Sequence, residues 1–334
     1  MDLKEQLQGN VFTDIIGQKE TKEQLKSALL MSHHMIIVGT PGIGKTTLAK
    51  NVAELLPTLE LSECAYHCHP DNPVCPFCKQ GENKTQNVPG RDRFVRIQGS
   101  PDLSVEDLIG DIDPIKALQF GPMSIEAFTP GKIFKANNGV LFFDELNRCP
   151  EKLQNALLQI LEEGVATVGG YDIDFPANFI FIGTMNPEDS STEKISDVFL
   201  DRVDLIYMTH PESLQFEQEI IQKKGNVLDV RFPEDLQSTM LKFIRQFRSS
   251  DKLEKVPSVR ASLSLYERSQ ANAYLSGSDT VRFRDIERAI VSVLSHRITM
   301  KPSVKYLQDP VDFVKKELND FMQKEKISSE GDDP

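Results

Sequence analysis

The chain has no tryptophan, few aromatic residues and little positive charge for its 334 residues. Phe, Tyr and Trp make up 7 % of the sequence, so no stacking platform for nucleic-acid bases is evident. The 38 Lys and Arg residues are outnumbered by 50 Asp and Glu, and the formal net charge of −12 disfavours the broad basic surface of a non-specific nucleic-acid binder. No apolar run approaches the roughly 18 residues that cross a bilayer. We therefore expect no membrane partner, and the charge disfavours a nucleic-acid partner, although a local basic patch stays open as an alternative.

The remaining composition is that of an ordinary globular protein. Hydrophobic residues account for 39 % and charged residues for 26 %. The length allows two domains, each with its own core. Residues 1–10 are charged and polar and do not form a secretory signal, so we expect a cytoplasmic location.

Apolar stretches alternate with helical patterns in the first two thirds of the chain. The expected helices cover residues 18–31, 47–56 and 151–163. The expected strands cover residues 35–38, 94–98, 140–143, 179–184 and 205–208, and residues 165–175 are expected to form a hairpin around Gly169-Gly170. This alternation predicts a largely parallel sheet covered by helices on both faces.

The composition changes at His210-Pro211. Only helical patterns follow up to about residue 300, including 236–247, 261–275 and 284–298, which predicts a small helical domain. Residues 309–326 form a further amphipathic helix, either packed on this domain or available to dock a partner.

The first strand leads into a phosphate-binding loop at residues 39–46. This segment matches G-x-x-x-x-G-K-[ST] at every position and lies between a strand and a helix, as the motif requires. The glycines let backbone N–H groups surround a polyphosphate, and the helix dipole favours negative charge. Lys45 would reach the β/γ oxygens, and Thr46 would supply a hydroxyl to Mg²⁺. The nucleotide-binding residues expected here are Gly39, Thr40, Pro41, Gly42, Ile43, Gly44, Lys45, Thr46 and Thr47.

Two acids end the third strand and match the Walker B pattern downstream of a phosphate loop. Asp144 would hold Mg²⁺ directly or through water, and Glu145 would orient and polarise the attacking water. After the fourth strand, the amide of Asn186 can donate and accept hydrogen bonds at once and could lie beside the γ-phosphate. The alternative for Asn186 is a simple Asn-Pro turn.

Two arginines are candidates for stabilising charge on a transferring phosphoryl group. Arg202 precedes the fifth strand and could act as an arginine finger toward the nucleotide of a neighbouring subunit, because a guanidinium matches that charge bidentately. The alternative for Arg202 is a local surface pair with Asp201. Arg260 opens a helix of the small domain and is either a second cationic contact or a solvated arginine.

Four of the five cysteines lie within fifteen positions, at Cys64, Cys68, Cys75 and Cys78. In a cytosolic chain, clustered thiols favour metal over disulfides. Four thiolates could hold a tetrahedral Zn²⁺, and they would leave no open position for catalysis. His67 and His69 could replace a thiol ligand, and redox or iron–sulfur chemistry and unliganded thiols stay as alternatives, although the spacing does not fit the ferredoxin patterns. Cys149 stands apart and is expected to serve packing.

Taken in order, these motifs resemble an AAA+ ATPase of the MoxR / magnesium-chelatase ATPase-subunit branch, over residues 12–300. Besides the Walker motifs, the resemblance rests on the segments 96–103, 107–113, 128–131, 136–148 and 200–202. The segments I-G-D-I-D-P-I-K-A-L and F-x-P-G-K are more similar to the chelatase subunit, and D-E-L-N-R is more similar to MoxR. The four-cysteine segment departs from the plain loop of many relatives.

The resemblance implies a fold and a set of roles. The fold is an αβα P-loop sandwich with a five-stranded, mainly parallel sheet in residues 1–210, followed by a small all-α lid in 211–300 and a C-terminal helix with an acidic tail in 301–334. Within the first domain, residues 57–91 are a cysteine-rich insertion, 100–128 carry the helix-2 insert and 165–175 form the hairpin before the sensor strand. Asn186 becomes sensor 1, Arg202 the arginine finger and Arg260 sensor 2, acting in cis or in trans, while Ile15, Ile16 and Gly17 line the adenine pocket.

Active assemblies in this branch are rings, usually hexamers, with ATP between neighbours and a von Willebrand factor A partner. The expected activity is therefore Mg²⁺-dependent ATP hydrolysis that remodels a client or drives metal insertion. Two rivals remain: a nucleotide-switched binding module, and a DNA-remodelling ATPase, against which the charge of −12 argues.

Overall fold

The computed structural model describes residues 3–81, 84–121, 124–168, 173–187, 195–306 and 308–327. Contacts divide the chain into two compact units. The first comprises Met1–Ile15, Lys19–Gly39 and Gly44–Met208, and the second comprises Ile16–Gln18, Thr40–Ile43 and Thr209–Pro334. Among the described residues, no helix is both long enough and apolar enough to cross a membrane.

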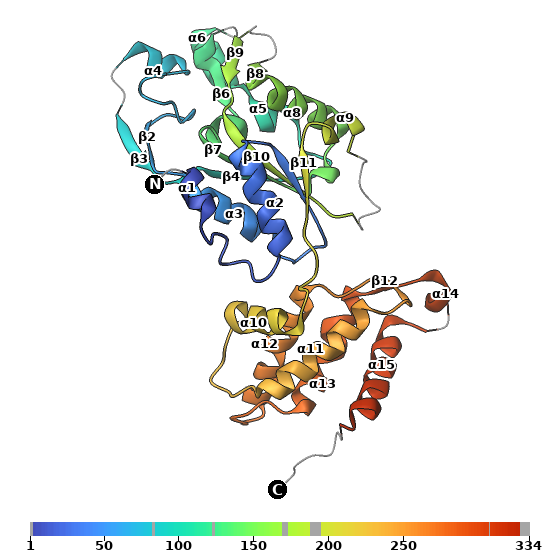
Figure 1. The fold of residues 1–334 in the computed structure, drawn as a ribbon. Helices are drawn as coiled ribbons and strands as arrows, with labels where there is room; N and C mark the ends of the chain where they lie inside the picture. Colours follow the sequence, from blue (N-terminus) through green and yellow to red (C-terminus); the bar gives the residue numbers. More distant parts are fainter. Residues whose placement is uncertain are drawn as a thin grey trace. The chain divides into compact units, whose positions relative to one another are not determined.

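A five-stranded sheet forms the centre of the first unit (Figure 1). Its strands lie in the order β11-β1-β10-β7-β4, and every neighbouring pair is parallel. The bounds are β1 Met35–Val38, β4 Phe94–Gln98, β7 Gly139–Asp144, β10 Phe179–Met185 and β11 Asp204–Tyr207. The prediction of a mainly parallel five-stranded sheet is confirmed.

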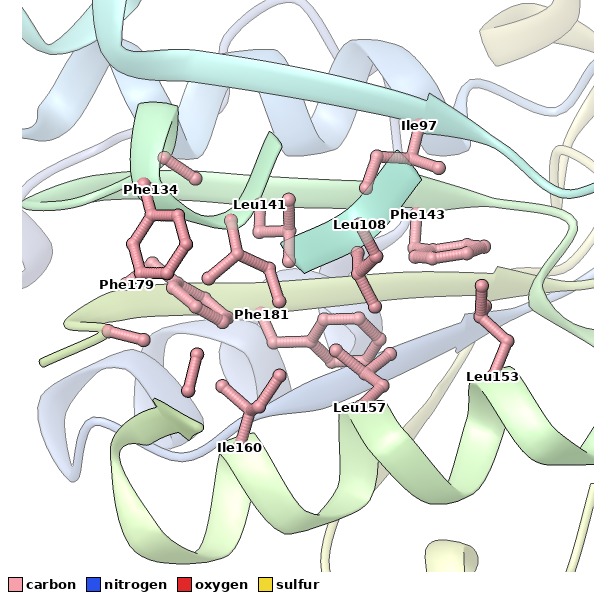
Figure 2. Packing of buried hydrophobic residues seen from close by; sticks show 14 of the residues in the cluster. Ile97, Leu108, Phe134, Leu141, Phe143, Leu153, Leu157, Ile160, Phe179 and Phe181 are labelled. Carbon is pink, nitrogen blue, oxygen red and sulfur yellow. The ribbon is translucent and has the colours of Figure 1, made fainter. Parts of the chain in front are cut away.

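Helices cover both faces of this sheet because its strands are apolar on both sides. Helices α2 (Lys19–Leu30) and α3 (Lys45–Leu55) contact β11 and β7, and α8 (Glu151–Glu163) lies on the opposite side of the sheet (Figure 1). Figure 2 shows how Leu153, Leu157 and Ile160 of α8 point toward the sheet. They pack in one buried cluster with side chains of the strands, Leu141, Phe143 and Phe181. This packing fixes the strands that carry the candidate site.

Shorter elements surround the sheet. The cysteine-rich segment lies between β2 (Leu59–Ser62) and β3 (Thr85–Val88), an antiparallel pair that periodicity did not predict, and it contains α4 (Pro76–Gln80). The remaining elements of this unit are α1 Leu3–Gln8, α5 Val105–Ile109, β5 Gly110–Ile112, α6 Pro114–Phe120, β6 Phe128–Pro130, α7 Lys132–Lys135, β8 Val165–Val168, β9 Ile173–Pro176 and α9 Asp197–Leu200. Strands β8 and β9 pair antiparallel, as a hairpin requires, while Gly169-Gly170 lie outside the described residues.

The second unit is mostly helical. Its elements are α10 Leu214–Lys224, α11 Glu234–Arg248, β12 Leu253–Lys255, α12 Val259–Leu275, α13 Phe283–Leu294, β13 Thr299–Met300, α14 Pro302–Lys305 and α15 Pro310–Glu325. The expectation of helical patterns alone is corrected by the antiparallel pair β12–β13, whose strands are too short to show an alternating pattern. The helix expected up to residue 298 ends at Leu294 and continues as a 3₁₀ turn, Ser295–Arg297. Helix α15 buries Phe313, Val314, Leu318 and Phe321 in the core of its own unit.

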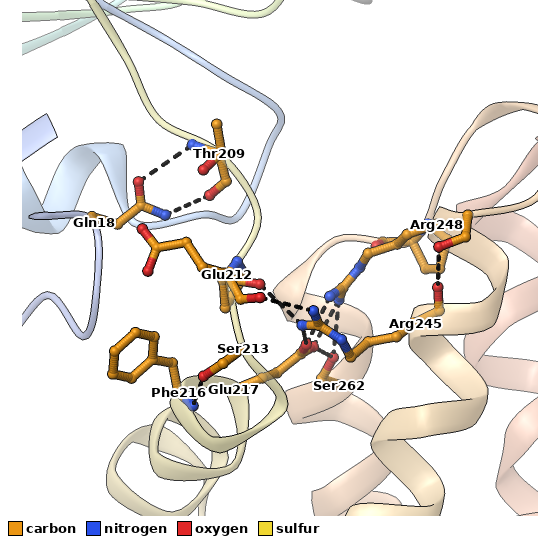
Figure 3. Close-up of polar contacts among 12 residues, drawn as sticks. Gln18, Thr209, Glu212, Ser213, Phe216, Glu217, Arg245, Arg248 and Ser262 are labelled. Atoms are coloured by element: carbon orange, nitrogen blue, oxygen red, sulfur yellow. Dashed lines mark hydrogen bonds and ion pairs between the residues drawn. The ribbon is translucent and has the colours of Figure 1, made fainter. Parts of the chain in front are cut away.

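A buried ion cluster joins the helices of the second unit (Figure 3). Glu217 is fully buried and accepts from Arg248 at 2.7 and 2.8 Å, from Arg245 at 3.2 Å and from the hydroxyl of Ser262 at 2.5 Å. Burial alone raises the pKa of Glu217, but the hydrogen bonds and charge of Arg248, then Ser262 and Arg245, hold it below its usual range. Glu217 is therefore a paired carboxylate that ties α10, α11 and α12 together.

Candidate functional site

The register of the sheet brings the predicted site residues of β1, β7 and β10 to one edge. Val38 is aligned with Met185, and Phe143 with Gly183. The next residue after Val38 is Gly39, opposite Asn186, and the next residue after Phe143 is Asp144, opposite Thr184, two positions before Asn186. Gly39, Asp144 and Asn186 therefore all lie at the edge where the parallel strands end. This edge is where open α/β sheets bind their ligands.

The phosphate-binding loop connects β1 to α3. Gly42 and Gly44 have φ of +84° and +105°, backbone conformations that favour glycine. Lys45 donates from Nζ to the carbonyl of Gly39 at 2.5 Å, and the N–H of Gly39 donates to the carbonyl of Met185 at 3.1 Å. Thr46 and Thr47 follow in the first turn of α3, so the N–H groups of a helix start are available for an anion.

Asp144 and Glu145 are tied together by a residue that was not predicted as a site residue. The hydroxyl of the fully buried Thr184 donates to Asp144 Oδ1 at 2.7 Å and accepts from the N–H of Glu145 at 2.9 Å. Glu145 has φ of +57°, which turns the chain sharply after β7. Gly99 makes this turn possible, because a Cβ there would lie 2.1 Å from the carbonyl oxygen of Glu145.

Three further polar residues hold the two carboxylates. Arg96 lies 2.5 Å from Asp144 Oδ2, Gln98 donates to Glu145 Oε2 at 2.9 Å, and Arg148 lies 3.2 Å from the same Glu145 oxygen. Sequence reasoning missed all three, although Gln98 is aligned with Asp144 in the sheet and Arg96 is two residues earlier on the same face. The Asp144 side chain is 15 % exposed and that of Glu145 31 %, so solvent and ligands can reach both.

The donor set at this edge suits magnesium. Mg²⁺ prefers oxygen ligands and is usually bound by one or two carboxylates together with substrate phosphates. Thr46 offers a hydroxyl and Asp144 a partly exposed carboxylate, so the residues fit the ion that the phosphate loop predicts.

Arg202 is paired within its own chain. Its guanidinium lies 3.1 Å from Glu162 of α8 and donates to the carbonyl of Val198 at 3.0 Å. The side chain is 34 % exposed, so it can exchange these contacts for others. The alternative of a surface pair between Arg202 and Asp201 is therefore replaced by an ion pair between Arg202 and Glu162.

The other predicted nucleotide contacts are distributed over both units. In the first unit, Ile15 is buried, and its Cδ1 is the atom nearest to a Cβ built on Gly44, at 3.4 Å. In the second unit, Gly42 lies against Arg260, because a Cβ on Gly42 would come within 2.6 Å of Arg260 Cγ. Ile16 is buried, and Gly17, with φ of +68°, packs against Phe216 of the same unit. The roles of these residues and of Asn186 stay predictions.

The four clustered cysteines meet in the folded chain. Their sulfur atoms all lie within 4.8 Å of one another, and three of the side chains are buried. Among the described residues, His67 and His69 are outside this group; His69 Nδ1 instead accepts from the N–H of Asp71 at 3.3 Å. The hydrogen bond from Cys68 lowers the pKa of Cys64 to about 5. Cys149 is buried in the same hydrophobic core of the first unit, but its sulfur is not one of the four that lie within 4.8 Å of one another.

Comparisons with known proteins match successive parts of the chain. Residues 11–83 match the family "Magnesium chelatase, subunit ChlI", residues 84–205 match "ATPase family associated with various cellular activities (AAA)", and residues 254–316 match "AAA lid domain". The magnesium-chelatase subunit ChlI homolog of Methanocaldococcus jannaschii is 27 % identical over 325 residues, which cover 87 % of this chain and 86 % of that one. The ChlI subunit of Mesostigma viride is also 27 % identical, over 87 % and 88 % of the two chains.

Among solved structures, the RuvB Holliday junction branch migration motor of Thermotoga maritima has a TM-score of 0.50 at 16 % identity, over 97 % of this chain and 82 % of that one. This likeness concerns the fold alone. The matched family models, the ChlI relatives and the order of the strands all indicate an AAA+ ATPase. Relatives in the AAA+ ATPase family imply ATP hydrolysis. The chain belongs to the AAA+ ATPases and carries domains of the magnesium-chelatase ChlI type.

Proposed function

We propose that the chain is a Mg²⁺-dependent ATP hydrolase of the MoxR / magnesium-chelatase type. The observation that carries this proposal is the sheet register, which brings Gly39, Asp144 and Asn186 to one edge with Glu145 next to Asp144. A phosphate loop alone would support nucleotide binding, whereas an adjacent carboxylate supports hydrolysis.

Each residue has a distinct task in this proposal. Lys45 exchanges the carbonyl of Gly39 for oxygens of the β- and γ-phosphates. Glu145 accepts the proton of the attacking water, and Asn186 holds that water near the γ-phosphate. When bound, Mg²⁺ neutralises charge on the phosphates, with Thr46 and Asp144 as its protein ligands.

The hydrogen bonds around Glu145 prepare it for this task. Gln98 and Arg148 both contact Oε2, and the backbone N–H is fixed by Thr184. A base held in this way needs little reorganisation before the water is activated. We infer that Gln98 and Thr184 act as positioning residues.

We propose further that active assemblies are rings, hexamers in the simplest form, in which Arg202 completes the site of a neighbour. Its partial exposure and its replaceable contact with Glu162 support this role. The curated relatives are named as subunits of magnesium chelatase, which favours a partner protein, and we propose one with a von Willebrand factor A domain. The work done with ATP would be remodelling of a client or insertion of a metal.

The proposed domain organisation follows the same resemblance. Residues 1–210 form the nucleotide domain, with the cysteine-rich insertion at 57–91, the helix-2 insert at 100–128 and the pre-sensor hairpin at 165–175. Residues 211–300 form the lid, in which Arg260 is sensor 2, and 301–334 hold the terminal helix and tail. Ile15, Ile16 and Gly17 line the adenine pocket.

The cofactors that we propose are ATP with Mg²⁺ and one structural Zn²⁺ on Cys64, Cys68, Cys75 and Cys78. The support for zinc is that four sulfur atoms lie within 4.8 Å of one another, which is the ligand set of a closed tetrahedral site.

ATP hydrolysis by the full chain tests the proposal. We expect phosphate release that requires Mg²⁺ and that Lys45→Ala abolishes, while Lys50→Ala, an exposed lysine on the same helix α3, retains it. Equal rates for Lys45→Ala and Lys50→Ala would contradict hydrolysis at this loop.

Mixing two inactive variants tests the shared site. Arg202→Ala lacks the finger and Glu145→Gln lacks the base, so a mixed ring contains some interfaces with both groups intact. We expect activity to rise on mixing. If Arg202→Ala alone keeps full activity, Arg202 does not act across subunits, and a nucleotide-switched binding module becomes the better description.

A further inference from the structure

The cysteine cluster has the features of a site built for thiolates. Backbone N–H groups point at the sulfurs: that of Cys68 at Cys64 Sγ (3.3 Å), those of Val74 and Cys75 at Cys68 Sγ (3.4 Å each), and that of Cys78 at Cys75 Sγ (3.4 Å). Hydrogen bonds of this kind stabilise negative charge on sulfur and orient metal ligands. Because four sulfurs complete a tetrahedron, the site is closed to substrates.

The loop between the first two cysteines is bound to the start of strand β7. Asn137 donates from Nδ2 to the carbonyl of Tyr66 at 3.1 Å, and Asn138 donates from Nδ2 to the carbonyl of His67 at 3.1 Å. Both asparagines belong to the turn between α7 and β7. Tyr66 is 2 % exposed, and its ring packs against Phe134 and Phe175 at 5.2 and 5.5 Å between centroids.

The same turn also holds the start of strand β10. The N–H of Asn178 donates to Asn137 Oδ1 at 2.9 Å, and the N–H of Asn138 donates to the carbonyl of Asn178 at 2.6 Å. Strand β10 begins at Phe179, and β7 begins at Gly139. The cysteine loop, β7 and β10 therefore meet at Asn137–Asn138.

We propose that Zn²⁺ on the four cysteines clamps this turn and thereby fixes the starts of the two strands whose other ends carry Asp144, Thr184 and Asn186. The inference rests on the zinc ion included in the proposed function, and it does not depend on ATP hydrolysis. Without zinc, residues 64–68 would be less fixed in position, and the hydrogen bonds of Asn137 and Asn138 to the carbonyls of Tyr66 and His67 would weaken. By reciprocity, the turn and the metal stabilise each other.

Metal analysis of the full chain, purified with reductant and without oxygen, tests the ligand set. A closed four-thiolate site predicts about one zinc per chain. Cys75→Ser should lose the zinc, while Cys149→Ser, which removes an equally buried thiol outside the cluster, should retain it. Iron with acid-labile sulfide in place of zinc, no metal, or equal loss in both variants would overturn the site.

If Cys75→Ser does not fold, the wild-type chain still answers the question. Titration with an organomercurial should release zinc to a coloured indicator as the thiols react. Thiols that react with no release of zinc would overturn the site. Measuring ATP hydrolysis on the same samples separates the two proposals, because a zinc-free chain that hydrolyses ATP refutes only the metal.

Hydrogen exchange tests the clamp. Removing zinc with a chelator should raise amide exchange at residues 139–143 and 179–183 more than at β11 of the same sheet. The matched variants are Asn138→Gly, which suits the φ of +59° there and removes only the side chain, and Asn155→Ala, which changes an exposed position of α8.

We expect Asn138→Gly to weaken zinc about 10-fold in a chelator competition, as loss of outer-shell partners does, and Asn155→Ala to leave it unchanged. Equal exchange in all strands after zinc removal, or unchanged zinc affinity in Asn138→Gly, would overturn the clamp while leaving the zinc site intact.

Discussion

Replacing Thr184 with valine should loosen the acidic pair at the end of β7. The hydroxyl makes one hydrogen bond to the carboxylate of Asp144 and one to the N–H of Glu145. A hydrogen bond to a charged group contributes about 1.5–3 kcal/mol and a neutral one about 0.5–1.5 kcal/mol. Because Asp144 is 15 % exposed and can regain water, we take the lower end of each range, which gives a loss of about 2 kcal/mol.

Thermal unfolding of the nucleotide-free chain measures this loss. The first unit has about 200 residues, so about 2 kcal/mol should lower its Tm by about 4–8 °C. Thr184→Ser is the matched control, since it keeps the hydroxyl and loses one buried methyl, about 0.8 kcal/mol. Thr184→Val should also lower ATP hydrolysis more than Thr184→Ser does, because the backbone of Glu145 is no longer held. The reasoning is refuted if the valine variant is as stable and as active as the serine variant.

Three further predictions concern charge. Glu217→Gln should destabilise the second unit by about 3–5 kcal/mol, because two arginines are left facing a neutral amide. Glu317→Gln is the control: it breaks an ion pair with the half-exposed Lys252 and should cost about 0–1 kcal/mol. Calorimetry measures both losses. The free energy of unfolding should fall in two steps as the pH is lowered, which circular dichroism can measure. Burial and then Arg248 lower the pKa of His210 from 6.5 to about 4, so the unfolded chain alone takes up that proton between these values. Glu217, whose pKa is held below 4.5, stabilises the fold above that pH and loses its contribution as the pH falls through its lowered pKa. A free energy of unfolding that does not change with pH over this range would contradict the steps assigned to His210 and to Glu217. Glu162→Gln should release Arg202 and lower the protein concentration needed for ATP-dependent ring assembly about 1.4- to 5-fold, because a surface ion pair is worth about 0.2–1 kcal/mol. Sedimentation measures this concentration, and a higher requirement in the variant would count against the exchange of Glu162 for a neighbouring subunit.

The sheet and the phosphate loop were predictable because their signals are local. Strand Met35–Val38 and the loop that follows it are read from consecutive residues, and so are the acids that end β7. The expected strands differ from the observed ones by at most one residue at either end. Strands β12 and β13, of three and two residues, are too short to carry a period, and β2 is separated from β3 by the whole cysteine segment.

The contacts around the acids were not predictable, since they join residues far apart in the sequence. Arg96 reaches Asp144 across 48 positions, and Thr184 reaches it across 40. Only the register, which aligns Gln98 with Asp144 and Gly183 with Phe143, brings them together. The cysteine spacing predicted a metal site. It did not predict that asparagines of the turn before β7 bind the cysteine loop, because they lie 71 positions away.

The most direct test of the central claim compares ATP binding and ATP hydrolysis in Glu145→Gln. This change keeps the size of the side chain and removes the base, while the phosphate loop is untouched. We expect ATP to bind as in the unaltered chain and hydrolysis to fall about 10²- to 10⁴-fold, the range for loss of a general base, whereas Glu163→Gln, at an exposed position of α8, should hydrolyse ATP normally. Hydrolysis by Glu145→Gln at the rate of the unaltered chain would contradict the account.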